Sequence, residues 1–285
     1  MKTRAIGDRT VSEIGLGGMQ LSISGRPDHD QGVATIHAAL DAGVTLIDTA
    51  DAYCLDDSET GHNERLIGEA LRSWGGDLSD VLVATKGGHV RPEGRWEVDG
   101  SPDHLRAACD ASLTALGVEA IGLYQLHRPD PSVPYAESVG VVGDLLDAGK
   151  IRMAGISNAD SGQIREAQGI LGGRLVSVQN QFSPAFRSSE PELRLCDELG
   201  IAFLPWGPLG GASRAAEVGS RFSAFAEVAS AHGVSPQQVA LAWMLALSPV
   251  VIPIPGSSRP STIEDSVAAA DLGLTDDEVE RLSAS

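Results

Sequence analysis

The chain alternates short apolar runs with helical stretches through almost its whole length, and this alternation limits what it can fold into. Each apolar run has the length of a strand buried on both faces, and the helical stretch after it can return the chain along the sheet. Such a repeat predicts a parallel sheet covered by helices, and eight strands close an α/β TIM barrel, (β/α)8. The expected strands are 14–17, 44–48, 81–85, three that begin at Leu123, Met153 and Val176, and then 201–204 and 250–254.

The helices expected between these strands carry ordinary start and stop signals. The clearest is 102–116, where Ser101 is a plausible N-cap and Gly117 a plausible end. The other expected helices are 30–42, 64–72, 135–148, 160–168 and 189–199, with 220–231 and 236–247 in the long connection before the last strand.

An open, doubly wound sheet is the rival architecture. Such a sheet usually has a glycine-rich phosphate loop after its first strand, followed at once by a helix. The cluster 15–18 resembles this loop only loosely, because Gln20 stands where the third glycine belongs and no helix follows directly. Without a linker or a shift in composition, the sequence favours one barrel domain that spans residues 1–285.

Composition and charge exclude several classes of partner. With 42% hydrophobic residues, the 285-residue chain can bury a large core, and its net charge of −18 disfavours nucleic acids and anionic membranes. The cysteines Cys54, Cys109 and Cys196 lie far apart without a C-x-x-C pair, so we expect neither disulfides nor a metal site. No signal peptide or membrane span is apparent, which predicts a cytoplasmic location.

Four polar side chains stand where expected strands end. Asp48 closes the second strand and Tyr53 follows it, while Lys86 and His127 close the third and fourth. The carboxyl ends of barrel strands share one rim, so we expect these four groups to meet. There Tyr53 can act as an acid, Lys86 can lower the pKa of its phenol, Asp48 can hold the lysine, and His127 can orient a carbonyl oxygen.

A carbonyl that is polarised and protonated is reduced only if a hydride donor also binds. Polar side chains after the fifth and sixth strands, Ser157, Asn158 and Gln179, suit the carboxamide of a nicotinamide. Trp206 can stack on its ring. The loops 205–211 and 255–259 offer backbone N–H groups to a pyrophosphate, and Arg259 is placed to meet a ribose phosphate.

The loop after the third strand is long for a barrel connection, and long loops on this face commonly line substrate pockets. Trp96 and Arg91 from this loop, together with Arg128 after the fourth strand, are therefore expected to contact the substrate.

These segments resemble the aldo-keto reductase family over nearly the whole chain. The matching stretches are 43–53, 63–68, 84–88, 123–127, 149–158, 179–180, 208–210 and 254–256. The resemblance implies a (β/α)8 barrel, NADPH-dependent reduction of an aldehyde or ketone to an alcohol, and no metal. Asp48, Tyr53, Lys86 and His127 correspond to the family's catalytic tetrad. The run 125–130 and Asp51 most resemble bacterial members that reduce pyridoxal or related aldehydes.

Departures from the family pattern bear on the cofactor. Near the adenine, Thr262, Asp265 and Ser266 replace a frequent arginine and Glu-Asn pair. Asp265 can still accept from the adenine amine, whereas the 2′-phosphate would depend on Arg259 and Ser257, so NADH stays an alternative to NADPH. The expected cofactor contacts are Gly18, Met19, Asp48, Ser157, Asn158, Gln179, Trp206, Gly207, Pro208, Leu209, Gly210, Ile254, Gly256, Ser257, Ser258, Arg259 and Asp265.

Two other functions remain open at this point. The same fold could hold NADPH as a redox-sensing or regulatory module with little turnover, although the intact tetrad favours an enzyme. A Schiff-base aldolase or isomerase that uses Lys86 would need no nicotinamide. The substrate itself and the oligomeric state are not readable from the sequence.

Overall fold

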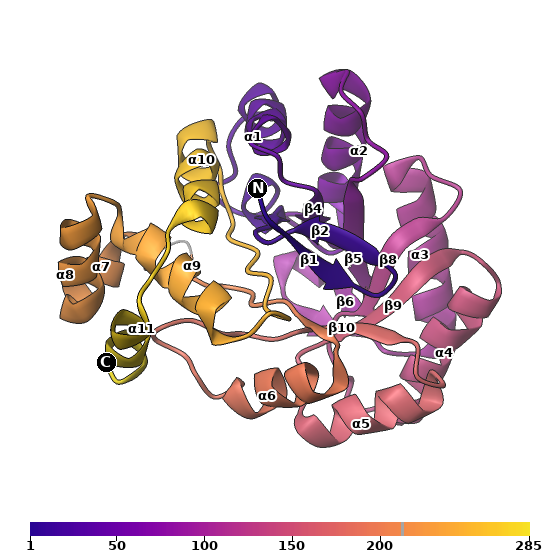
Figure 1. Ribbon diagram of the computed structural model, residues 1–285. Coiled ribbons are helices and arrows are strands. Elements are labelled where there is room, and N and C mark those ends of the chain that lie inside the picture. The colour runs from indigo at the N-terminus through magenta and orange to yellow at the C-terminus, as the bar shows by residue number, and fades with distance from the viewer. Residues whose placement is uncertain (212–213) are drawn as a thin grey trace.

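The computed structural model describes residues 1–211 and 214–285, and a parallel sheet curled into a barrel lies at its centre (Figure 1). The sheet has seven regular strands in the order β11-β10-β9-β8-β5-β4-β3. Their bounds are β3 Leu16–Gly17, β4 Leu46–Asp48, β5 Leu82–Gly87, β8 Ile121–Leu126, β9 Ile151–Ser157, β10 Leu175–Gln179 and β11 Ala202–Phe203. All six pairings are parallel, as the alternating sequence pattern predicts.

The expected eighth strand closes the barrel without becoming a regular strand. Val251 pairs in parallel with Phe203 of β11, and Gly256 pairs with Gly17 of β3. The backbone N–H of Ile252 also donates to Phe203 O at 2.9 Å. Pro253 and the proline at position 255 have no N–H to donate, so the hydrogen-bond ladder is interrupted at both positions. The predicted eight-membered barrel is therefore confirmed, with an irregular last member.

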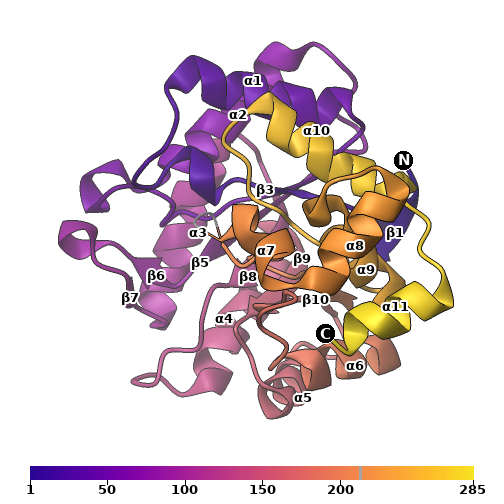
Figure 2. The same ribbon diagram turned by 90° about the vertical axis from the view of Figure 1, so that its left-hand side faces the viewer.

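Helices surround the barrel (Figure 1). The predicted helix 102–116 is α3 (Pro102–Leu116): the Ser101 hydroxyl accepts from the His104 N–H, and Gly117 ends the helix with a φ of 71°. The predicted helix 220–231 differs, because an extended Phe222 separates α7 (Val218–Arg221) from α8 (Ser223–His232). These two helices lie on the side that faces the viewer in Figure 2. The others are α1 His29–Asp41, α2 His62–Trp74, α4 Tyr135–Asp147, α5 Ser161–Ile170, α6 Glu190–Leu199, α9 Pro236–Leu247, α10 Pro260–Ala268 and α11 Asp276–Ser283.

An antiparallel hairpin that the sequence analysis missed covers the amino-terminal end of the barrel. It consists of β1 (Thr3–Ile6) and β2 (Arg9–Ser12). Ile6 and Val11 are buried in one apolar cluster with residues of β4, β5, β8 and β9. The hairpin therefore closes the amino-terminal end of the barrel with apolar side chains. The polar residues predicted for the site lie at the opposite end, where the strands finish.

A second hairpin, β6 (His89–Val90) and β7 (Glu97–Val98), gives order to the long loop after β5. It stands at the carboxyl end of the barrel strands and carries Trp96. Across the described ranges, no helix has both the length and the apolar character needed to span a membrane.

Candidate active site

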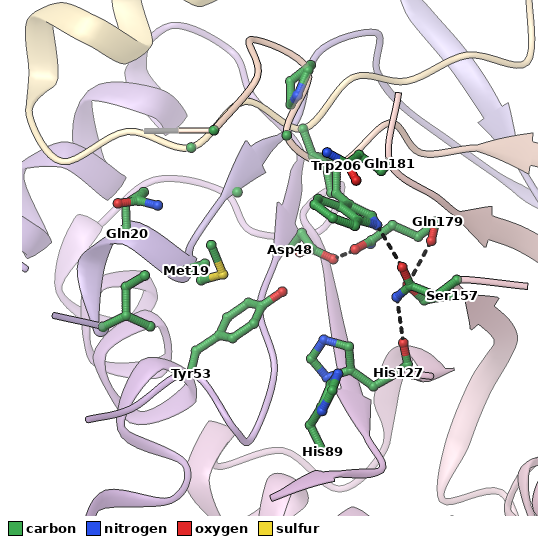
Figure 3. A pocket seen from close by; sticks show the side chains of 18 of the residues that line it. Met19, Gln20, Asp48, Tyr53, His89, His127, Ser157, Gln179, Gln181 and Trp206 are labelled. Atoms are coloured by element: carbon green, nitrogen blue, oxygen red, sulfur yellow. Dashed lines mark hydrogen bonds between the residues drawn. The ribbon is translucent and has the colours of Figure 1, made fainter. Parts of the chain in front are cut away.

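The barrel brings the four predicted catalytic residues together. Asp48 is the last residue of β4, Lys86 lies near the end of β5, and His127 follows β8 directly. These strands are neighbours in the sheet, so their ends lie side by side. Tyr53 comes from the loop after β4, and its hydroxyl is directed toward the space between Asp48 and His127 (Figure 3).

Lys86 is the centre of this group. Its side chain is fully buried, and its ammonium Nζ donates to three oxygens: Asp48 Oδ2 at 2.7 Å, the Thr49 carbonyl at 2.7 Å and the Tyr53 hydroxyl at 3.0 Å. A buried ammonium that is fully hydrogen-bonded to a carboxylate is tolerated, whereas an unpaired one is costly. Gln179 Nε2 donates to the other carboxylate oxygen, Asp48 Oδ1, at 2.7 Å and so fixes the carboxylate.

Burial decides the protonation states in this group. Burial alone lowers the pKa of Lys86, but the Asp48 carboxylate and Tyr53 together raise it above that of an ordinary lysine, so the side chain is charged. Burial also raises the pKa of the Tyr53 phenol, and the opposing effect of Lys86 is smaller. The lowering that the sequence predicts from Lys86 is present, but the effect of burial on the pKa of Tyr53 is larger. Tyr53 keeps its proton at neutral pH, as a proton donor must.

His127 faces the same space as a neutral ring. Burial, followed by the charge of Lys86, holds its pKa well below the usual value for histidine. Its ring stands edge-to-face against Tyr53 at 5.7 Å and against His89 at 4.3 Å between ring centroids. A neutral imidazole beside the phenol can form a hydrogen bond with a carbonyl oxygen without adding a charge.

Hydrogen bonds connect the polar residues expected to hold a nicotinamide (Figure 3). Asn158 takes a left-handed backbone conformation with φ 57°, which is uncommon outside glycine but tolerated by asparagine. Its Nδ2 donates to the His127 carbonyl at 3.0 Å, and its Oδ1 accepts from Trp206 Nε1 at 3.2 Å. The Ser157 hydroxyl donates to the Gln179 carbonyl at 2.7 Å. Their positions are therefore set before any ligand binds.

A cavity of about 950 Å³ extends from Tyr53 across the barrel mouth. Its size is at the upper end of the range for small-molecule sites, about 300–1,000 Å³. Of the predicted contacts, the cavity is lined by Met19, Asp48, Tyr53, Trp96, His127, Arg128, Ser157, Asn158, Gln179, Trp206, Gly207, Pro208, Leu209, Gly210, Ile254 and Gly256.

The glycine-rich loop after β11 has the backbone expected of a phosphate-binding segment. Gly207, Gly210 and Gly211 have φ values of 59°, 86° and 89°, a region that side-chain-bearing residues rarely adopt. All three line the cavity, and the Gly210 N–H donates to the Gly207 carbonyl at 2.8 Å, which holds the turn of the loop. Together with Trp206 and the Asn158 network, this loop fits an extended dinucleotide.

Several predicted contacts lie elsewhere. Gly18 is not part of the cavity lining; its N–H donates to Asp48 O, and a Cβ there would stand 2.6 Å from Asn63 Oδ1. Asp265 accepts from Ser235 and Gln238 at 2.8 and 2.6 Å, so its carboxylate links α10 to α9 instead of facing the cavity. The other predicted residues outside the lining are Ser257, Ser258, Arg259, Arg91 and Lys86, and Lys86 lies directly behind Tyr53 and Asp48.

The structure also adds lining residues that the sequence analysis did not single out. His89 stands beside His127, and Gln181 lies next to Trp206. Gln20 and Ile23 complete the rim near Met19. The sequence held one sign that His89 could belong to the site. His89 lies only three residues after Lys86, so it follows the carboxyl end of the same strand, β5. Among the described residues, no cluster of His, Cys, Asp or Glu has metal-binding geometry.

Comparisons with known proteins agree with this geometry. The model of the aldo/keto reductase family matches residues 13–285. The 6-dehydroglucose reductase of Novosphingobium aromaticivorans is 36% identical over 268 residues, which cover 91% of this chain and 86% of the relative.

Solved structures agree as well. An aldo/keto reductase from Klebsiella pneumoniae in complex with NADP and acetate superposes with a TM-score of 0.82 and 27% identity, covering 99% of this chain and 94% of the other. The glycerol dehydrogenase of Gluconobacter oxydans gives a TM-score of 0.84 and 29% identity, with 99% and 94% covered. The fold, the cavity and these matches lead to one conclusion: the chain belongs to the aldo/keto reductase family and is an NADP-dependent oxidoreductase.

Proposed function

We propose that this enzyme reduces a small aldehyde or ketone to an alcohol, with Tyr53 as the proton donor. The observation that supports this role is the buried contact of 3.0 Å between the Tyr53 hydroxyl and Lys86 Nζ at the edge of the cavity. Lys86 is in turn held by Asp48 at 2.7 Å. A protonated phenol beside a fixed positive charge can release its proton, because the charge stabilises the phenolate that remains.

When bound, NADPH supplies the hydride for the carbonyl carbon. The protein residues do the rest. His127 orients the carbonyl oxygen by a hydrogen bond, Tyr53 protonates that oxygen, and Lys86 stabilises the resulting phenolate. Gln179 keeps the Asp48 carboxylate aligned, so that the ammonium does not shift during the proton transfer.

The cofactor assignment rests on chemistry that the cavity lining offers. We place the nicotinamide against Trp206, near Asn158 and Gln179, and the pyrophosphate along the loop from Gly207 to Gly211. Arg259 is exposed and outside the cavity lining, with its Nε bound to Thr262 Oγ1 at 2.9 Å. An exposed, weakly held guanidinium can turn toward a 2′-phosphate, and this favours NADPH over NADH at the adenosine end.

The substrate side of the cavity favours a flat carbonyl compound. Trp96 and His89 stand edge-to-face at 5.5 Å between ring centroids, and the exposed Arg128 adds a positive charge at the rim. A pyridoxal-like aldehyde suits this combination of rings and charge. An oxidised sugar is the second candidate, because a relative at 36% identity is a 6-dehydroglucose reductase.

Turnover with a panel of carbonyl compounds tests the proposal. NADPH and NADH consumption are followed by absorbance with pyridoxal, an aromatic aldehyde and an oxidised sugar. Tyr53→Phe is expected to abolish turnover while NADPH affinity stays within about twofold, since the phenol is the proton source. Substantial turnover by the Tyr53→Phe enzyme would refute the role of Tyr53. Tight NADPH binding without turnover by the wild-type chain would favour a redox-sensing module.

A Schiff-base mechanism is disfavoured by the surroundings of Lys86. Its ammonium already has three acceptors, and its raised pKa keeps the amine from being a free nucleophile at neutral pH. We also propose that the protein works in a reducing compartment such as the cytoplasm, because its three cysteines are all buried and unpaired.

A further inference from the structure

Within residues 1–211 and 214–285, the hydrogen-bond acceptors of the buried Arg91 are all main-chain carbonyls. Its side chain lies in the interior, with the residue 7% exposed, and its guanidinium donates to four carbonyl oxygens, none of which belongs to a carboxylate. A buried cation without an anionic partner is costly, so its presence calls for a specific explanation. Arg91 is also absent from the cavity lining, which contradicts the expectation that it contacts the substrate.

The four carbonyls connect two separate segments of the active-site face. Arg91 Nη1 donates to Ala52 and Cys54, the residues on either side of Tyr53, at 3.4 and 2.7 Å. Arg91 Nη2 donates to Leu55 at 3.0 Å and to Gly94 at 2.7 Å. The backbone that carries the Tyr53 phenol is therefore tied to the loop that carries Trp96.

The same guanidinium also supports the Trp96 ring. The Arg91 Cζ lies 3.9 Å from the ring centroid, within the range of a cation–π contact. Trp96 is 46% exposed and lines the cavity 6.4 Å from the Tyr53 ring, measured between centroids. The indole also stands edge-to-face against His89 at 5.5 Å, but Arg91 is the contact that links the Trp96 ring to the backbone on either side of Tyr53.

We propose that Arg91 is a positioning residue that fixes the Tyr53 phenol and the Trp96 ring relative to each other. This inference rests on the proposed function, since it concerns the geometry of the same reduction. The planar fork of arginine can reach carbonyls on two segments and stack on a ring at the same time, whereas the single nitrogen of lysine cannot. A displacement of about 1 Å at a catalytic group can cost about 100-fold in rate.

The test compares two arginines that make the same kinds of contact in different places. Arg187 also donates to two main-chain carbonyls, those of Leu282 and Ser283, and its Cζ lies 4.6 Å from the Trp243 ring centroid. Arg187 is not part of the cavity lining. Arg91→Met and Arg187→Met therefore remove contacts of the same kind, four carbonyl bonds in the first case and two in the second, and both variants are expected to lose stability.

Only the Arg91 change is expected to alter the reaction. The single-turnover rate of NADPH oxidation is measured with a small aliphatic aldehyde and with an aromatic aldehyde, because product release can mask chemistry in kcat. We expect Arg91→Met to lower this rate about 10- to 100-fold on both substrates. We expect KM to rise several-fold more for the aromatic aldehyde, which needs Trp96. NADPH affinity stays within about twofold, and Arg187→Met keeps the wild-type rate.

A folded Arg91→Met enzyme with a single-turnover rate within about twofold of wild type would overturn the proposal. An equal loss of rate in Arg187→Met would overturn it too, because that loss would follow from stability alone. If Arg91→Met does not fold, Arg91→Lys is judged by the same measurements, and a wild-type rate in that variant counts against the proposal. Absence of turnover in the wild-type enzyme would refute the proposed function instead, and it is measured first.

Discussion

Replacing Lys86 by methionine removes the charge on which the proposed proton transfer depends. The substitution keeps the apolar length of the side chain but deletes the three hydrogen bonds of Nζ to Asp48, Thr49 and Tyr53. Because the position is fully buried, water is poorly placed to replace the ammonium. The expected result is a large loss of rate with little change in NADPH affinity.

The magnitude follows from the distance between Lys86 Nζ and the Tyr53 hydroxyl, 3.0 Å. At an effective dielectric constant of about 20, two unit charges at this distance attract by about 5.5 kcal/mol, which bounds the effect on the pKa of Tyr53 at about four units. If about half of this attraction stabilises the transition state, its loss in Lys86→Met lowers the rate about 100-fold. General acid catalysis as a whole contributes about 10²–10⁴-fold, so the loss should stay within that range.

The pH profile gives the sign of the effect. Lys86 lowers the pKa of Tyr53 against the larger effect of burial, so its removal raises that pKa further. Reduction needs the protonated phenol, and its rate falls as pH rises through this pKa. In Lys86→Met the alkaline decline should therefore move to higher pH, and the difference from wild type should be largest near neutral pH and shrink above it.

The assay is single-turnover NADPH oxidation from about pH 6 to about pH 11, because the pKa of Tyr53 lies above the ordinary tyrosine value of about 10. Lys150→Met is the matched control, because Lys150 pairs with Asp110 on the surface and is outside the cavity lining. Lys86→Met leaves the Asp48 carboxylate buried without its cation, which costs about 3–5 kcal/mol of stability. The double variant with Asp48→Asn relieves that cost and shows whether the rate loss persists in a well-folded protein. A Lys86→Met rate within tenfold of wild type, or an unmoved alkaline decline, would refute the reasoning.

Three further changes test separate parts of the structure. Trp206→Leu should raise the Kd for NADPH about tenfold in a fluorescence titration, because a flat stacking surface is lost; an unchanged Kd would remove Trp206 from the cofactor site. Asp265→Ala should leave the Kd for NADPH within about twofold. It should lower the free energy of unfolding, measured in denaturant, by about 1–3 kcal/mol, because Ser235 and Gln238 lose their acceptor. A large change in Kd would instead support the predicted contact of Asp265 with the adenine. Burial, followed by the charge of Glu64, raises the pKa of Asp51 well above 3.8, so the wild type loses stability as pH rises from about 4 through that raised value. The Tm of Asp51→Asn should therefore rise relative to that of the wild type between about pH 5 and pH 8. A Tm difference that does not change with pH would contradict a raised pKa of the buried Asp51.

Much of the barrel was readable from the sequence because its signal is local. A buried parallel strand is a short apolar run, and a helix such as α3 has its cap at Ser101 and its stop at Gly117, so a window of residues is enough to place them. The irregular last strand and the hairpin β1–β2 were harder, since each is held by partners far away in the chain. Only those partners show that residues 250–256 pair on both sides.

The proposed site divides in the same way. That Asp48, Lys86 and His127 stand at strand ends follows from the order of residues, because the carboxyl ends of barrel strands share one rim. The partners of Arg91 and Asp265 do not follow from that order. Each side chain sits in a segment where the sequence permits a ligand contact, and in each case hydrogen-bond acceptors or donors from another segment hold it elsewhere.

The sequence by itself determined which side chains stand at the barrel mouth and which strand carries each of them. The alternation of strands and helices that places them is visible in short stretches of neighbouring residues. Tertiary structure alone decided how those groups behave. The Tyr53 pKa rises although Lys86 opposes it, since desolvation depends on every atom packed around the phenol. The order of the strands along the chain does not specify which atoms pack around the phenol. That packing exists only in the folded barrel.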